Sequence, residues 1–227
     1  PDTDWHVARL YRFAKRFGAS VLVADFSRYV IDLNRSSQDE ALYDQQLSTG
    51  LCPQRTFSGE PIYQAGRGVT PAEQVLRVEE YWRPYHERLA TTLQQLRDQH
   101  GFALLWDAHS IRGTVPSLFD GALPDLNVGT NDGASCVADV ADAVVDVARQ
   151  SSFSHVFNGR FRGGHITRHY GDPQQRVCAL QLEIAQRNYM DEDTLVYDRQ
   201  RARNLRETIE TMVGAYVDTA TEYFRVR

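Results

Sequence analysis

The sequence has few cysteines, no long apolar run and no opening signal segment. Cys52, Cys136 and Cys178 are odd in number and widely spaced, which argues against a disulfide framework or a cysteine zinc knuckle and indicates free thiols in a reducing cytoplasm. No uninterrupted apolar stretch approaches the ~20 residues that cross a bilayer. We therefore expect a cytoplasmic protein without a membrane partner.

Acidic residues outnumber basic ones, and lysine is nearly absent. The net charge is −5, which argues against a general binder of nucleic acid phosphates. Lys15 is the only lysine, a bias that gene composition can produce, so it is not evidence of phosphate binding. With 227 residues, 42% of them hydrophobic, the chain can bury one sizeable core, and no linker or repeat divides it. We expect a single domain over 1–227, with its oligomeric state left open.

The hydrophobic periodicity predicts strands interleaved with helices, as in a layered α/β domain. Thr70, Pro71 and Glu73 form a helix start, and Gly101 a stop, with a bend near Pro84. A polar, turn-rich loop over 36–69 is long enough to be a substrate lid. The expected helices are 7–17, 70–100, 135–149 and 198–224, and the expected strands are 20–25, 29–33, 104–109, 126–128, 155–158, 164–169 and 177–184.

The apolar run 104–106 ends in Asp107, Ala108, His109 and Ser110. Asp107 and His109 are two apart on a strand, so their side chains leave by the same face. They either bind a metal, with the aspartate as a ligand or orienting the histidine, or simply satisfy each other at a strand end. Near the N-terminus, Asp4 is ordinarily a capping or first-turn acid of the helix that follows.

Three further segments carry more polar chemistry than a sheet needs. Asn34 and Arg35 end a strand; they can bind a carboxylate at two points or form a solvated surface turn. Glu183 lies within an apolar strand, where burial would raise its pKa toward useful values unless it faces solvent. The segment 158–171 is either a ligand-binding cluster or a β-hairpin with charged edges. Its anion-binding and proton-donating candidates are Arg160, Arg162, Arg168, His169 and Tyr170.

Taken in order, these segments resemble the N-formylglutamate amidohydrolases, also called N-formylglutamate deformylases. The likeness covers nearly the whole chain. It is carried by TDWH (3–6), RYVIDLNR (28–35), TGL (49–51), WDAHS (106–110), PSLFDG (116–121), LNVGT (126–130), NGRFRGG (158–164), ITRHYG (166–171) and LQLE (180–183). The resemblance implies a three-layer α/β/α fold with a central mixed sheet, similar to zinc carboxypeptidases and aspartoacylases.

The resemblance also assigns roles. It implies that His109 and Asp4 are zinc ligands, that Asn34 and Arg35 hold a substrate carboxylate, and that Glu183 activates the metal-bound water. Arg160 or Arg168 would stabilise the oxyanion. The implied small-molecule substrate is N-formyl-L-glutamate, hydrolysed to release formate in histidine degradation. Its two carboxylates account for several arginines in one site, Arg162 among them, with His169 and Tyr170 beside them.

One departure concerns the metal. The family carries a Pro-His-Ser/Thr-Gly motif on a strand upstream of the Asp4 region, and its histidine is a further zinc ligand. This sequence begins after that position, so we expect an N-terminal strand of the family to be missing from it. Asp4 and His109 alone fall short of the three protein ligands of a catalytic zinc. Two alternatives to the deformylase remain: an amidohydrolase for another N-acyl acidic amino acid, and a metal-free protein that binds acidic amino acids.

Overall fold

A computed structural model describes residues 2–39 and 49–226 of the chain. Its centre is a mixed four-stranded sheet with the strand order β1-β4-β2-β3. The strands are β1 (Ala103–Ile111), β2 (Leu126–Gly129), β3 (His155–Phe157) and β4 (Val177–Ala185). β1 pairs with β4 in parallel, β2 pairs with β3 in parallel, and β2 runs antiparallel to β4. The α/β class and the mixed sheet are confirmed.

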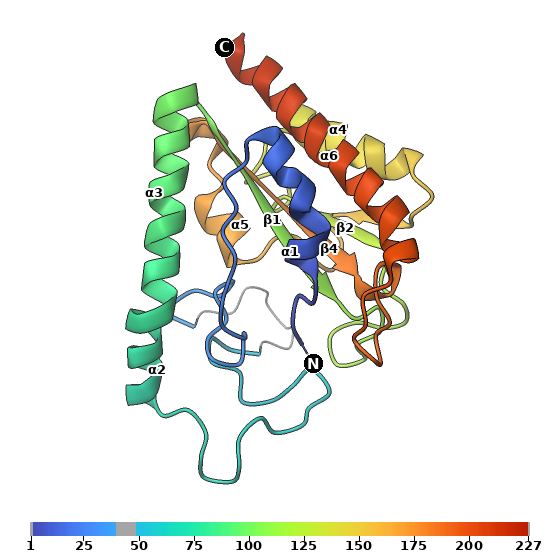
Figure 1. Ribbon diagram of the computed structural model, residues 1–227. Coiled ribbons are helices and arrows are strands. Elements are labelled where there is room, and N and C mark those ends of the chain that lie inside the picture. The colour runs from blue at the N-terminus through green and yellow to red at the C-terminus, as the bar shows by residue number, and fades with distance from the viewer. Residues whose placement is uncertain (1, 40–48, 227) are drawn as a thin grey trace.

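Helices cover both faces of this sheet (Figure 1). On one face lie α4 (Ala138–Gln150) and α6 (Arg199–Arg225), with α1 (Val7–Leu10) and the 3₁₀ segment η1 (Tyr11–Phe17) beside them. On the other face lie α3 (Arg83–His100) and α5 (His165–Tyr170). The larger apolar core lies between the sheet and α4 and α6, and a smaller one lies under α3. Two short 3₁₀ turns, η3 (Pro173–Gln175) and η4 (Gln186–Asn188), flank β4.

The helix expected over 70–100 forms in three parts. The hydroxyl of Thr70 accepts from the backbone N–H of Glu73 at 3.2 Å and caps α2 (Pro71–Arg77). The expected bend is a π-helical turn, η2 (Val78–Trp82), placed just before Pro84. α3 then ends at Gly101, whose φ of 79° suits a residue without a Cβ atom.

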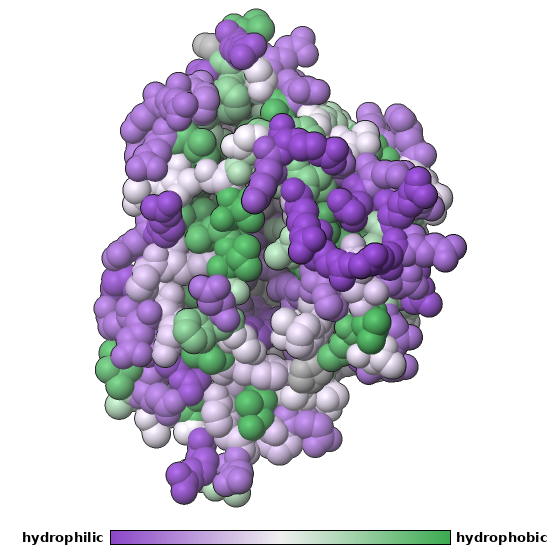
Figure 2. Space-filling view, viewed as in Figure 1, coloured by the Kyte–Doolittle hydropathy of each residue, from purple (hydrophilic) through white to green (hydrophobic). Residues whose placement is uncertain are grey.

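Three expected strands are wrong. The described chain over 18–33 forms no strand: Asp32 N–H donates to Leu51 O at 2.7 Å, but no ladder of such backbone bonds pairs the segment with a described neighbour. Val21, Val23 and Phe26 are 56%, 52% and 57% exposed. Figure 2 shows apolar side chains gathered on the face where this segment runs beside α3. The third, 164–169, is helix α5 instead. Residues 40–48 of the expected lid lie outside the described residues.

Two further features concern the helices and the cysteines. No helix within the described ranges is both long and apolar enough to cross a membrane. Cys52, Cys136 and Cys178 are buried free thiols, as their spacing indicated.

Candidate active site

The site starts from the alternation of side chains on β1 and β4. Leu180, Leu182 and Ile184 point into the core under α4 and α6, so Gln181 and Glu183 point to the opposite face. His109 of β1 is the register partner of Glu183, as Asp107 is of Gln181. Because paired residues of neighbouring strands share a face, four polar side chains meet at the carboxyl ends of the two strands, where ligands bind in α/β proteins.

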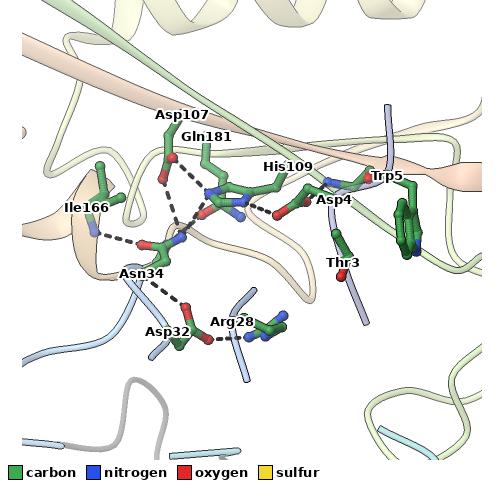
Figure 3. A network of polar contacts seen from close by, with 12 residues as sticks. Thr3, Asp4, Trp5, Arg28, Asp32, Asn34, Asp107, His109, Ile166 and Gln181 are labelled. Atoms are coloured by element: carbon green, nitrogen blue, oxygen red, sulfur yellow. Dashed lines mark hydrogen bonds and ion pairs between the residues drawn. The ribbon is translucent and has the colours of Figure 1, made fainter. Parts of the chain in front are cut away.

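His109 is held at both of its ring nitrogens (Figure 3). Its Nε2 lies 2.8 Å from Asp107 Oδ1, and its Nδ1 lies 3.4 Å from Asp4 Oδ2. The other oxygen of Asp107 accepts from the Thr167 hydroxyl at 3.1 Å. A carboxylate only accepts, so the Nε2 proton donates to Asp107 and fixes the ring, which leaves Nδ1 facing Asp4. The alternative in which Asp107 and His109 simply satisfy each other explains the contact at Nε2. It does not explain the contact of Nδ1 with Asp4.

Asp4 is directed to the sheet by its own contacts. Its Oδ1 accepts from the backbone N–H of Ser110 at 2.5 Å, and its side chain remains 45% exposed. The first helix is instead entered through His6, which makes no side-chain cap. The capping role considered for Asp4 is therefore wrong. The 3.4 Å contact of Asp4 with His109 meets the distance that a shared ion requires, while the metal role of both residues stays a prediction.

The ionisable groups of this cluster shift one another's pKa values. Burial raises the pKa of Glu183 to about 8, although the nearby His109 lowers it; Glu183 is only 8% exposed, so the solvent-facing alternative is wrong. Burial lowers the pKa of His109, but Asp107 and Asp4 outweigh it and the net shift is well upward. Partial desolvation of its carboxylate raises the pKa of Asp4, but the charge of His109 outweighs it and the net shift is downward. Glu183 is therefore a buried carboxyl group with a raised pKa, the setting in which a carboxyl group serves as a general acid or base.

Sequence reasoning missed two residues of this site, Arg28 and Asp32. Arg28 donates to Asp32 Oδ2, and the Arg35 Nε lies 3.7 Å from the same oxygen. Burial raises the pKa of Asp4 and of Glu183, and His109 lowers both. The Arg28 guanidinium adds a smaller effect that also lowers them. The signal was present in RYVIDLNR, where Asp32 lies four residues from Arg28 and three from Arg35. One buried carboxylate therefore holds two guanidinium groups at the edge of the site.

Asn34 lies against His109. Its Nδ2 is 3.0 Å from His109 Nε2 and 3.5 Å from Asp107 Oδ2, and its Oδ1 accepts from the backbone N–H of Ile166 at 2.8 Å. Gly164 makes this possible, because a Cβ atom there would lie 2.4 Å from Asn34 Nδ2. Because His109 Nε2 already donates to Asp107, the Asn34 amide N–H is directed to Asp107 Oδ2 and only packs against the ring. Its role in binding a substrate carboxylate stays a prediction.

The candidates in 158–171 are spread over a loop and a helix, so the β-hairpin alternative is wrong. Arg160 Nε donates to Leu118 O at 2.7 Å, and Arg162 Nη1 forms an exposed ion pair of 3.1 Å with Asp132. Arg168 Nε donates to Gly163 O at 2.8 Å. His169 is exposed, and its ring stacks on that of His165. The Tyr170 hydroxyl contacts His86. The catalytic and substrate-binding roles of these five residues stay predictions.

The donor set fits a zinc ion in part. His109 Nδ1 and Asp4 Oδ2 are of the right chemistry and close enough to share one, and the Asp107 contact to Nε2 is the support that a metal-bound histidine usually has. Within residues 2–39 and 49–226, no group of three His, Cys, Asp or Glu side chains converges so as to hold a metal. The described residues therefore fit as two ligands of such a site.

Comparison with known proteins finds relatives over nearly the whole chain. The N-formylglutamate deformylase of Pseudomonas putida is 47% identical over 227 residues, which are 99% of this chain and 85% of the relative. That of Pseudomonas aeruginosa is 51% identical over 98% of this chain and 84% of its own length. The crystal structure of an N-formylglutamate amidohydrolase from Ralstonia eutropha superposes with a TM-score of 0.80 and 26% identity, covering 98% and 83% of the two chains. A protein from Agrobacterium tumefaciens, 19% identical, shares the fold, with a TM-score of 0.69 and coverage of 96% and 78%. The family model for N-formylglutamate amidohydrolase matches residues 1–190, and this chain therefore belongs to that family of amide hydrolases.

Proposed function

We propose that this protein hydrolyses the formamide bond of N-formyl-L-glutamate and releases formate and L-glutamate. The observation that carries the proposal is a buried carboxyl group, Glu183, facing His109 across paired strands, with Arg28 and Arg35 at the same edge. This combines a proton-exchanging acid with cations for an anionic substrate. The names of the two Pseudomonas relatives support the same reaction.

The residues divide the work as follows. Arg35 binds one substrate carboxylate, because a guanidinium fork matches a carboxylate at two points. Glu183 removes a proton from the attacking water as its oxygen bonds to the formyl carbon. The same proton then passes to the amide nitrogen as the C–N bond breaks, so that formate and the free amine leave. Arg28, whose positive charge lowers the pKa of Asp4 and of Glu183, would stabilise the developing oxyanion, the role that the family resemblance leads one to expect of Arg160 or Arg168.

The metal belongs to the proposal as a cofactor. His109 through Nδ1 and Asp4 through its carboxylate would hold a zinc ion, together with a further ligand. A bound zinc ion supplies Lewis acidity and lowers the pKa of water from 15.7 toward ~7. Asp107 keeps the His109 ring in the orientation that this binding needs.

The test is a panel of four substrates with formate or acetate release as the readout: the N-formyl and N-acetyl derivatives of L-glutamate, N-formyl-L-aspartate and N-formyl-L-glutamine. We expect kcat/KM to be highest for N-formyl-L-glutamate. A higher value for an acetyl derivative or for the aspartate would assign the protein to another N-acyl acidic amino acid. Binding of N-formyl-L-glutamate without turnover, in protein supplied with zinc, would identify a binding protein and overturn the proposal.

A further inference from the structure

The turn that carries Arg35 is held by two side chains from the helix beside it. Trp82 Nε1 donates to the carbonyl oxygen of Arg35 at 2.9 Å, and His86 Nε2 donates to that of Leu33 at 2.9 Å. Trp82 and His86 are one helical turn apart, and their rings stack with centroids 3.8 Å apart. The helix therefore holds the backbone by one hydrogen bond on each side of Asn34.

A third residue fixes the ring of His86. A carbonyl oxygen only accepts, so Nε2 carries the proton and Nδ1 is an acceptor. The Tyr170 hydroxyl lies 2.8 Å from that Nδ1 and 3.2 Å from the His86 carbonyl oxygen. Burial lowers the pKa of His86 to about 4, which keeps the ring neutral at assay pH and preserves this arrangement. Tyr170 thus reaches the Leu33 carbonyl through His86.

From this geometry we propose that Trp82, His86 and Tyr170, here named the turn clamp, are positioning residues that orient Arg35 for the substrate carboxylate. The inference rests on the proposed function, in which Arg35 binds that carboxylate. It gives Tyr170 a role that acts through His86, in place of the direct substrate contact expected from the sequence.

The physical reason is that the position of the Arg35 guanidinium depends on the orientation of the Arg35 backbone. The guanidinium is at the end of a long side chain, so a small rotation of its peptide moves it far. The Asp32 carboxylate restrains it at 3.7 Å through Nε, and Trp82 restrains the peptide itself. The Arg35 N–H also donates to Asp32 O at 3.1 Å, so losing the Trp82 bond would loosen the turn without unfolding it, and a displacement of about 1 Å in a positioning group can cost roughly a hundredfold in rate. The loss should fall on substrate binding, because Glu183 and His109 stand on the sheet strands.

The test uses substitutions that each remove one hydrogen bond. Trp82→Phe removes the bond to Arg35 O and keeps an aromatic ring, and Tyr170→Phe removes the single hydroxyl that faces His86. We expect each to raise KM for N-formyl-L-glutamate about five- to twentyfold with kcat changed less than threefold. The inhibition constant of L-glutamate should rise in parallel. A substrate lacking the carboxylate that Arg35 binds should show a much smaller change.

Trp106→Phe is the matched control, because the Trp106 indole N–H donates to Tyr11 OH, away from the turn. It should leave KM near that of the wild type. Equal KM increases in Trp82→Phe and Trp106→Phe would overturn the inference, since the effect would then be general. A fall in kcat with unchanged KM in Trp82→Phe and Tyr170→Phe would also overturn it.

His86 allows a rescue experiment. His86→Gln retains an N–H donor that can reach Leu33 O, whereas His86→Phe retains the ring and loses the donor. We expect KM to be closer to wild type in His86→Gln, and equal KM values in the two would contradict the inference. If His86→Phe does not fold, as circular dichroism would show, Tyr170→Phe still decides. Wild-type protein inactive on N-formyl-L-glutamate would refute the proposed function instead, which separates the two failures.

Discussion

Glu183 shows how one residue acquires chemistry from its surroundings. Its carboxyl lies on a strand whose neighbours are apolar, and desolvation is the largest cause of its raised pKa. We predict that Glu183→Gln keeps the fold and lowers kcat by roughly 10²-fold or more, because it removes the proton acceptor and keeps the shape. Steady-state kinetics with circular dichroism would check this, with the exposed Glu207→Gln as the control. Near-normal turnover would make Glu183 structural, and Asp107 would be the next candidate base.

Arg35 permits a thermodynamic cycle at the same scale. Arg35→Lys should not be conservative, because an ammonium cannot reproduce the planar two-point contact. Kinetics of wild type and variant on N-formyl-L-glutamate, and on the analogue with the matching carboxylate amidated, should give a coupling on the order of 1.5–3 kcal/mol. Additive losses would show that Arg35 does not contact that carboxylate. The contact would then be assigned to the arginines between Arg160 and Arg168.

At the scale of elements, the packing of α3 on α5 predicts an acid-sensitive contact. The rings of His86 on α3 and His165 on α5 lie with centroids 5.5 Å apart, and burial lowers the pKa of each to about 4. The unfolded chain, with histidine pKa near 6.5, binds more protons than the folded one between these values. The free energy of unfolding is therefore highest above about pH 6.5, and it decreases as the pH falls toward 4.

The slope of the free energy of unfolding reaches at most about 1.4 kcal/mol per pH unit for each such histidine. Urea denaturation at pH 5, 6 and 7 would measure it. His86→Gln should reduce the slope, because it removes one of the two groups. An unchanged slope in that variant would show that His86 titrates alike in the folded and unfolded chains.

For the molecule as a whole, the metal hypothesis joins the N-terminal segment to the sheet. Asp4 and His109 are 105 residues apart in sequence and in contact in the fold. An ion shared by them would stabilise the folded protein, by about 2.7 kcal/mol at a free concentration one hundred times its Kd. We predict that zinc raises the melting temperature of metal-free protein and that Asp4→Asn and His109→Ala each weaken the effect. Elemental analysis showing undiminished zinc in both variants would contradict the assignment.

Much of the fold could be predicted from local pattern. Apolar runs and caps predicted β1, β4, α4 and α6 to within a few residues, because buried strands and amphipathic helices are written in the spacing of apolar side chains. The segments 20–25 and 29–33 have the composition of strands and form none, because a strand also needs a neighbour with which to form a ladder of backbone hydrogen bonds. The segment 164–169 became a helix that places the Ile166 N–H on Asn34.

The sequence by itself determined which residue types carry the chemistry, since an acid in an apolar strand and an Asn-Arg pair stand out without coordinates. Only the tertiary structure decided which of them meet. It brought Asp4 to His109, joined Arg28 and Arg35 through Asp32, and placed Tyr170 behind His86. The physical reason is that polar contacts act over a few ångströms in space, and strand register with helix packing brings distant parts of the chain within that range.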